Sequence, residues 1–461
     1  MERPSAELME PSYETWATSD RFLPKTFARP FIRFTRVEAS SGIVLLVAAI
    51  VAMVWANSAF SETYFSILET HLTIELGGFH FDESVLHLIN DGLMAIFFFV
   101  VGLEIKRELV LGDLRDRKAA ALPVMAALGG MIVPALIYFA LNAGTDAARG
   151  WGIPMATDIA FAVGVVALLG SRVPPGAKLF LLALAIADDI GAISVIAVFY
   201  TSELHIGYFA LAIAGLAAVW VAQRSRVRAL IFYIPLALLI WFFTLESGVH
   251  ATLAGVALGF LTPAHPYFKP REFDTRARGI LDQFPVEAES PAAQERAEHE
   301  VISMIATAQE SISPLSRMEE NLVSWSSYVI VPLFALANAG VDFRGTSINE
   351  TATSAIALGV ALGLIVGKMV GISLFTFIAV RSGMGILPQG TGWNHIIGLS
   401  AVAGIGFTVS LFVAGLAFVD PHQIELAKVG IFIGSFVSGV LGALLLSRAR
   451  KAGPRTSSAA S

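Results

Sequence analysis

The chain alternates between long apolar runs and short polar connections. An apolar run of about 17–25 residues can cross a bilayer as a helix, and the sequence predicts about twelve such spans. They lie near residues 38–57, 84–104, 119–141, 151–170, 177–199, 205–222, 229–245, 248–263, 321–340, 353–380, 393–418 and 424–447. The pattern indicates an all-α polytopic membrane protein with about twelve transmembrane helices.

The composition supports this class. Of the 461 residues, 55% are hydrophobic and 15% are charged, and the mean hydropathy of +0.70 is far too high for a soluble protein of this length. The absence of Cys excludes disulfides, thiolate chemistry and Cys-based metal sites. Residues 1–36 are polar and lack the apolar core of a cleavable signal peptide, so we expect the first span to act as the targeting element.

Basic residues predict the orientation, because cytoplasmic loops collect Lys and Arg. On one side they are Arg29, Arg33 and Arg36; Lys106, Arg107, Arg115, Arg117 and Lys118; Arg172 and Lys178; Arg224, Arg226 and Arg228; Lys269 to Arg317; Arg381; and Arg448, Arg450 and Lys451. The opposite loops hold only Arg149 and Arg344, with Lys428 near the start of the last span. An even number of spans with both termini in the cytoplasm follows.

A short segment between the first two spans predicts a β-hairpin. Residues 72–81 alternate apolar and polar positions around Gly77 and Gly78, which is typical of two strands joined by a tight turn. An exposed strand edge can pair with a second subunit. We therefore expect a homodimer joined through residues 72–81, with a self-contained hairpin as the alternative.

Residues 264–316 predict a cytoplasmic linker. They carry mixed charge, several prolines and helix-compatible stretches such as 292–309, and the segment is too small for an enzyme domain. The expected organisation is a cytoplasmic N-terminus (1–36), spans one to eight (37–263) with a periplasmic hairpin near 70–82, this linker (264–316), spans nine to twelve (317–448) and a cytoplasmic tail (449–461).

Three acids and one base lie inside apolar runs. Asp158 lies in span four, Asp188 and Asp189 are neighbours in span five, and Lys368 lies in span ten. A charge at the bilayer centre costs about 2.5–3.5 kcal/mol on insertion scales, so these residues predict an ion or proton site. Neighbours on a helix point about 100° apart, so one aspartate can line a cavity while the other meets Lys368. Salt bridges that only fix helix packing are the alternative, although they leave other buried carboxylates unpaired, and such carboxylates readily take up a proton.

Two spans carry signals of an interrupted helix. Span four contains Pro154, which removes a backbone donor, followed by Thr157 and Asp158, whose oxygens compete for backbone groups. Span eleven contains Gly404 and Gly406, for which close helix packing is the alternative. Irregular backbone at membrane depth is tolerated where it faces protein or a water-filled cavity. Interrupted spans in corresponding halves predict a transport site near the bilayer midplane.

Several segments, in this order along the chain, resemble those of bacterial NhaA-type sodium/proton antiporters. They are Asn90-Asp91-Gly92-Leu-Met-Ala-Ile-Phe-Phe with Val101-Gly-Leu-Glu104-Ile-Lys-Arg-Glu108-Leu, Ala156-Thr157-Asp158-Ile-Ala-Phe-Ala, Ala187-Asp188-Asp189-Ile-Gly-Ala-Ile, Ser247-Gly-Val-His250-Ala-Thr-Leu-Ala-Gly, and Pro332-Leu-Phe-Ala-Leu-Ala-Asn338-Ala-Gly. The resemblance runs from about residue 31 to 448. That family is itself a standard example of inverted-repeat transporters.

The resemblance implies an inverted-topology repeat that relates spans three to five with spans ten to twelve, with spans four and eleven interrupted. It assigns Na+ binding and proton exchange to Asp188 and Asp189, the helix crossing to Asp158 and Thr157, and charge compensation or proton transfer to Lys368. Candidates for a pH response or a cytoplasmic funnel are Asp91, Glu104, Arg107, Glu108, His250 and Glu319. For His250, packing at a helix start is the alternative. Glu320 and Val323 depart from the family pattern, so its pH profile is not carried over.

The resulting hypothesis is an electrogenic, pH-dependent antiporter in the bacterial inner membrane. It would export Na+ or Li+ in exchange for external protons by alternating access, with both ions competing for buried aspartates. It would need no cofactor and no nucleic acid, and it would not be an enzyme. The alternatives are a transporter of another small solute and an intramembrane aspartyl protease, for which these aspartates lack the expected Gly-x-Gly-Asp context.

Overall fold

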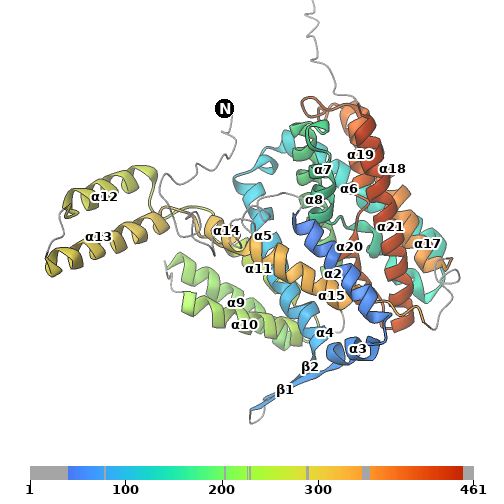
Figure 1. The fold of residues 1–461 in the computed structure, drawn as a ribbon, viewed down its shortest axis with the longest axis horizontal. Coiled ribbons are helices and arrows are strands. Elements are labelled where there is room, and N and C mark those ends of the chain that lie inside the picture. The colour runs from blue at the N-terminus through green and yellow to red at the C-terminus, as the bar shows by residue number, and fades with distance from the viewer. Residues whose placement is uncertain are drawn as a thin grey trace, which may run out of the picture.

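The computed structural model describes residues 40–76, 79–201, 204–225, 227, 230–286, 290–344 and 353–449. Several expectations lie outside these residues: the N-terminus 1–36 with its basic residues, Arg226, Arg228, the Gly77–Gly78 turn, and the tail beyond Ala449 with Arg450 and Lys451. The described chain is an assembly of helices with one two-stranded sheet (Figure 1). The protein is therefore an all-α membrane protein, as the apolar runs predict.

The N-terminal half runs from α2 to α11. Its elements are α2 (Ser40–Ala56), α3 (Ser61–Glu69), β1 (His71–Leu76), β2 (Phe79–Ser84), α4 (Val85–His87), η3 (Leu88–Leu93), α5 (Met94–Val110), η4 (Asp113–Arg115), α6 (Arg117–Asn142), η5 (Asp146–Met155), α7 (Ile159–Leu168), η6 (Gly170–Arg172), α8 (Pro175–Phe199), α9 (Ile206–Arg224), α10 (Leu230–Glu246) and α11 (Thr252–Leu261). The strands β1 and β2 pair antiparallel with His71 opposite Ser84, which places a hairpin where the alternating pattern predicts it.

The C-terminal half runs from α12 to α21. Its elements are α12 (Pro270–Gln283), α13 (Pro291–Glu310), α14 (Pro314–Trp325), η7 (Ser326–Ile330), α15 (Val331–Asn338), α17 (Ala355–Leu362), η8 (Gly363–Gly367), α18 (Lys368–Arg381), α19 (Trp393–Val402), α20 (Phe407–Ala417) and α21 (Pro421–Arg448). Three π-helical turns, η3, η7 and η8, lie inside longer helices. Such turns are often found near functional residues. The turn η8 directly precedes Lys368.

Within the described residues, seven helical segments are long and apolar enough to cross a membrane, or up to ten if each bent helix pair is one span. They are 85–110, 117–142, 175–199, 206–224, 314–338, 355–381 and 421–448, and the bent pairs are α2 with α3, η5 with α7, and α19 with α20. Two shorter apolar helices, 231–246 and 252–261, lie between them in sequence. The protein is thus a multi-pass membrane protein.

The helices form two bundles that meet where α2 packs against α7, α5 against α8 and α15 against α20. In one bundle α6 packs against α18 and α8, while α21 packs against α17 and α19. In the other, α5 packs against α11 and α15 packs against α2. The largest buried apolar cluster joins the bundles. Within it, the ring of Phe412 lies 5.4 Å from that of Phe98 and 6.3 Å from that of Phe334.

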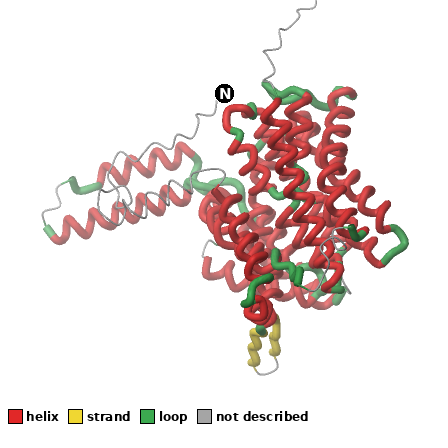
Figure 2. Tube along the Cα trace, turned by 45° about the vertical axis from the view of Figure 1, so that its right-hand side comes forward, coloured by secondary structure: helices red, strands yellow, loops and turns green. Residues whose placement is uncertain are grey.

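Two features extend beyond the bundles. The strands protrude from one end (Figure 2), which we call the hairpin side. The paired helices α12 and α13 project away from the bundles in both views (Figures 1 and 2). They fill much of the predicted linker, for which the sequence predicted helix-compatible stretches such as 292–309.

Candidate functional site

The chain leaves the helical conformation twice near the middle of the bundle. The helix η5 ends at Met155 and α7 begins at Ile159, at an angle of 42°. The helix α19 ends at Val402 and α20 begins at Phe407, at an angle of 48°. Pro154 lies in the last turn of η5, where its ring and missing N–H oppose a continuing helix.

The two interrupted segments are joined by hydrogen bonds that use backbone N–H and carbonyl groups, which in a continuous helix would pair within the same helix. The Asp158 N–H donates to the Ile405 carbonyl at 2.6 Å, and the Ser410 hydroxyl donates to the Ile153 carbonyl at 2.7 Å. Unpaired backbone groups are costly at membrane depth. Each break therefore supplies partners that the other needs.

Glycine makes this close crossing possible. A Cβ atom added at Gly404 would lie 2.3 Å from the Leu364 carbonyl oxygen, and one added at Gly406 would lie 2.9 Å from the Ala156 carbonyl oxygen. Both positions therefore combine a helix break with close packing, the two interpretations that the sequence left open.

Asp158 caps both helices that begin at the crossing. Its Oδ1 accepts from the Phe161 N–H of α7 at 3.1 Å. Its Oδ2 accepts from the Thr408 N–H and hydroxyl at 3.0 and 2.6 Å. One buried carboxylate thus faces the positive ends of two helices. The sequence analysis did not single out Thr408; the signal that could have found it is a hydroxyl in the first turn after the Gly404 and Gly406 break.

Asp188 pairs with the lysine of span ten. The Lys368 Nζ lies 2.5 Å from Asp188 Oδ2, and the two side chains are 0% and 1% exposed. The Thr157 hydroxyl lies 2.8 Å from the same oxygen and 3.1 Å from Lys368 Nζ. Its single hydrogen can reach either Asp188 or the Ala403 carbonyl, which also lies at 2.8 Å. The Asp188 Oδ1 is buried without a hydrogen-bond partner among the described residues.

Asp189 differs from its neighbour in both surroundings and contacts. It is 7% exposed, and its carboxylate accepts no hydrogen bond within the described part of the chain. Asp188, Glu104, Lys368 and Asp158 are its electrostatic neighbours. Carboxylate oxygens are the ligands that hard cations prefer. Asp189 and the free oxygen of Asp188 are therefore the groups available to a cation or a proton.

The described residues contain no group of three or more His, Cys, Asp or Glu side chains that could hold a metal ion.

A charged cluster lies where α5 approaches α14. Glu104, Arg107 and Glu108 are spaced at i, i+3 and i+4, which places them on one helix face. Arg107 donates to the Glu319 carboxylate, and its guanidinium lies 3.4 Å from Glu108 Oε1. Glu104 interacts electrostatically with Glu319, Arg107 and Asp189. It therefore links the cluster with the buried acids.

Two predicted members do not join this cluster. Asp91 lies in η3 near the hairpin side, 3.9 Å from His87, and at 1.5 Å per residue it is about 20 Å along the helix from Glu104. Asp91 is therefore not part of this cluster, and its role in a pH response stays a prediction. The His250 Nε2 lies 2.7 Å from the Tyr200 carbonyl oxygen, just before α11. His250 thus lies at the start of a helix, as in the alternative that the sequence analysis gave for it.

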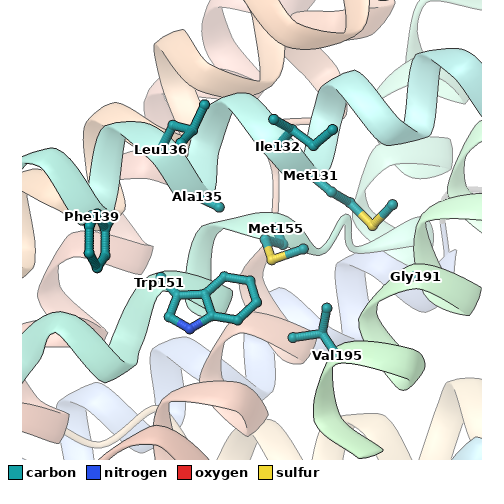
Figure 3. A pocket seen from close by; sticks show the side chains of 9 residues that line it. All are labelled: Met131, Ile132, Ala135, Leu136, Phe139, Trp151, Met155, Gly191 and Val195. Atoms are coloured by element: carbon teal, nitrogen blue, oxygen red, sulfur yellow. The ribbon is translucent and has the colours of Figure 1, made fainter. Parts of the chain in front are cut away.

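An apolar pocket of about 460 Å³ lies between α6, η5 and α8 (Figure 3). Met131, Trp151, Met155 and Val195 point into it, and Gly191 lines it two residues after Asp189. No titratable side chain lines the pocket, so it offers nothing to hold a cation. It extends from the level of Asp189 toward the hairpin side.

A multi-pass helical protein whose buried acids and lysine meet at two broken helices is typical of secondary ion transporters. The chain belongs to the family described as Na+/H+ antiporter 1, whose model matches residues 32–446. This confirms the resemblance seen in the sequence over nearly the same residues.

Named relatives cover almost the whole chain. The Na+/H+ antiporter NhaA of Rhodopirellula baltica is 46% identical over 421 residues, which cover 91% of this chain and 93% of that protein. NhaA of an Anaeromyxobacter species is 47% identical over 419 residues, 91% of each chain. NhaA 2 of Sorangium cellulosum is 44% identical over 427 residues, 93% of this chain and 91% of that protein. These relatives are named as transporters rather than enzymes.

Proposed function

We propose that this protein is an electrogenic, pH-dependent antiporter that exports Na+ or Li+ and imports protons. The observation that carries the proposal is the unequal pair of aspartates. Asp188 is held by Lys368 at 2.5 Å, whereas Asp189 has no hydrogen-bond partner among the described residues. Membership in the antiporter family supports sodium and protons as the exchanged ions.

Competition for the same oxygens couples the two ions. A protonated Asp189 has lost the charge that attracts a cation, while a Na+ ion at Asp189 blocks the proton. The bound ion therefore leaves only by exchange, because an empty charged carboxylate is costly to carry through a low-dielectric environment. Higher cytoplasmic pH favours Na+ uptake because it removes the competing proton.

An electrogenic cycle needs more than one proton for each Na+. Asp189 can supply one, and the Asp188–Lys368 pair is the nearest source of another. When Na+ approaches the free Oδ1 of Asp188, it competes with the ammonium group for that carboxylate. Lys368 either braces Asp188 throughout or gives up a proton at this step, and its variants separate the two roles.

Alternating access would come from motion between the two bundles. The charged cluster around Glu104 on one side of Asp189 and the apolar pocket on the other support a conformation that faces the cytoplasm. In this proposal the chain has twelve spans. An inverted repeat relates α6, η5–α7 and α8 with α17–α18, α19–α20 and α21. The two bent helix pairs support it, since each is the middle member of its triplet.

The location is the bacterial inner membrane, with both termini in the cytoplasm and the hairpin in the periplasm. The side-specific Lys and Arg residues support this orientation. The protruding edge of β1 and β2 supports a homodimer joined at residues 72–81.

Purified protein in liposomes tests the activity. With an acidic lumen, external Na+ or Li+ should dissipate the pH gradient, and K+ at the same concentration should not. An imposed membrane potential should change the rate if the exchange is electrogenic. Equal responses to Na+ and K+, or no response to either, would refute the proposed function.

A further inference from the structure

The apolar pocket between α6, η5 and α8 is open to the lipid-facing surface of the protein. Ile132, Leu136 and Phe139 line it and are among the exposed residues of α6. This helix is one of the described segments that are long and apolar enough to cross a membrane, so its exposed apolar side chains contact lipid hydrocarbon rather than water. Hydrocarbon can therefore enter the pocket from the side, and we call the pocket the α6/α8 groove.

The groove accepts an apolar occupant of ligand size. Its volume of about 460 Å³ falls within the range of about 300–1,000 Å³ that is usual for small-molecule sites. Met131, Trp151, Met155 and Val195 point into it from α6, η5 and α8 (Figure 3). No titratable side chain lines it, so its lining matches hydrocarbon and not a polar ligand.

The groove is about as deep as one leaflet of a bilayer. Its α6 wall runs from Met131 to Phe139, which are about 12 Å apart along the helix. The hydrocarbon layer of one leaflet is about 15 Å thick. The deep end lies beside Gly191, two residues after Asp189, and the groove extends from there toward the hairpin side. These dimensions match an acyl chain that descends from the hairpin-side leaflet.

A cation lies at the hairpin-side end of the groove. Arg149 is an exposed residue of η5, two positions before Trp151. The Tyr200 hydroxyl donates to the Arg149 carbonyl oxygen at 2.8 Å, and the ring of the preceding residue, Phe199, lies 5.1 Å from that of Trp151. Arg149 forms no ion pair within the described part of the chain. Its guanidinium is therefore available to an anionic group at the membrane surface.

An acid lies beyond this cation on the same face of η5. In a 3₁₀ helix residues i and i+3 eclipse, with about 6 Å between them, so Asp146, Arg149, Gly152 and Met155 share one face. Asp146 is exposed and, like Arg149, has no ion pair among the residues that the structure describes. From the middle of the bundle outward, this face thus presents the groove residue Met155, then a cation, then a carboxylate.

We infer that the α6/α8 groove binds one acyl chain of a phospholipid whose headgroup carries a phosphate and a primary ammonium, as in phosphatidylethanolamine. The lipid comes from the hairpin-side leaflet. Arg149 donates to the phosphate, and Asp146 accepts from the ammonium group beyond it. The end of the chain packs against Met131 and Met155. This lipid site does not depend on the proposed ion exchange.

The two charges distinguish this headgroup from others. A quaternary ammonium, as in phosphatidylcholine, has no N–H to donate to Asp146. A headgroup with negative charge only, as in phosphatidylglycerol, satisfies Arg149 but places an anion near that carboxylate. A free fatty acid offers Arg149 a carboxylate and offers Asp146 nothing. Specificity for the primary ammonium therefore rests on Asp146.

Photolabelling of the unmodified protein in phosphatidylcholine vesicles tests whether a chain enters the groove. The probe is a trace of phosphatidylethanolamine with a diazirine near the end of one acyl chain. We expect it to label Met155, which is only 5% exposed, as strongly as the lipid-facing Leu238, which is 61% exposed. Ile153 of the same helix is 0% exposed and does not line the groove, so it should stay unlabelled. Labelling of Leu238 without Met155 would overturn the inference.

Competition by unlabelled lipids tests the headgroup. Added phosphatidylethanolamine should reduce the labelling of Met155 several-fold more than equal amounts of phosphatidylglycerol or oleic acid. The labelling of Leu238 should respond to all three alike. Equal competition at Met155 would show contact with bulk lipid only, and stronger competition by oleic acid would assign the groove to a free fatty acid. Either result would overturn the phospholipid site.

Charge-neutral variants test the two headgroup contacts. Arg149→Gln and Asp146→Asn should each remove most of the preference for phosphatidylethanolamine at Met155. Arg344→Gln is the matched control, because this second hairpin-side arginine is paired with Asp342 at 2.7 Å and does not adjoin the groove. An unchanged preference in both test variants would refute the assigned contacts.

Filling the groove tests the chain contact separately. Ala135→Phe places a ring in the groove and should lower the labelling of Met155 several-fold. Ala210→Phe makes the same change at an exposed position of α9 and should leave the labelling unchanged. Equal labelling of Met155 in the two variants would contradict occupation of the groove. If Ala135→Phe does not fold, the labelling of the unmodified protein decides.

Discussion

Lys368 of α18 and Asp188 of α8 form a fully buried ion pair, with Nζ and Oδ2 2.5 Å apart. The two adjacent aspartates therefore have different roles: Asp188 is held in the ion pair, and Asp189 remains available to bind an ion. The pair also connects Lys368, which directly follows the π-helical turn η8, with α8, the helix that carries both aspartates. The following predictions depend on this division.

Removal of Lys368 should destabilise the protein. In Lys368→Ala, Asp188 becomes an unpaired buried charge, which typically costs about 3–5 kcal/mol. Adding Asp188→Asn to this variant removes the charge and should restore most of the loss, as thermal unfolding in detergent can measure. A stable Lys368→Ala protein without exchange would instead assign a proton-carrying role to Lys368.

Gly406→Ala should destabilise the crossing of the broken helices. The added Cβ would lie 2.9 Å from the Ala156 carbonyl oxygen and 2.8 Å from Leu364 Cδ2, and such overpacking costs about 1–3 kcal/mol. Gly415→Ala is the control on the same helix, because nothing lies within 4 Å of the added atom there. It should leave the unfolding temperature unchanged or raise it slightly. Equal effects of the two variants would argue against a tight crossing.

Glu104→Gln should weaken Na+ uptake without abolishing turnover. Glu104 adds negative potential near Asp189, so its loss should raise the KM for Na+ by about two- to tenfold with little change in kcat. Glu298→Gln, on the projecting α13, makes the same change in net charge far from the site and is the control. The two KM values should differ most at low ionic strength; a common shift would contradict a local effect.

Deletion of residues 72–81 should produce monomers that still exchange ions. The strands provide the expected subunit contact but contribute no residue to the buried site. Light scattering in detergent gives the mass, and a liposome assay gives the activity. Dimers of unchanged stability would refute the assembly role of the hairpin.

The sequence correctly predicted an all-α multi-pass membrane protein because apolar runs reflect the bilayer directly. Its count of about twelve spans stays a prediction, since seven segments of the described chain, or up to ten with the bent pairs, are long and apolar enough to cross a membrane. The sequence was less accurate at their ends. The span expected at 84–104 continues as helix to Val110, since Lys106, Arg107 and Glu108 are polar yet remain helical beyond the apolar region. The hydropathy of the sequence does not show where a helix ends when its last turns are polar and lie in a charged cluster.

Contacts between distant residues were the least predictable part of the site. Asp188 and Lys368 are 180 positions apart. The sequence and the family resemblance suggested Asp188 as the partner of Lys368 and Asp189 as the exchange carboxylate, but they did not define the surroundings of either side chain. The double cap by Asp158 depends on α7 and α20 starting at the same point in space.

Sodium-driven proton movement by Asp189→Asn most directly tests the central claim that Asp189 is the exchange carboxylate. Asparagine preserves size and removes the charge, and no hydrogen bond among the described residues depends on that carboxylate. We therefore predict a protein with normal stability and no detectable exchange of Na+ or Li+ for protons. A folded Asp189→Asn variant that retained full exchange would contradict the account.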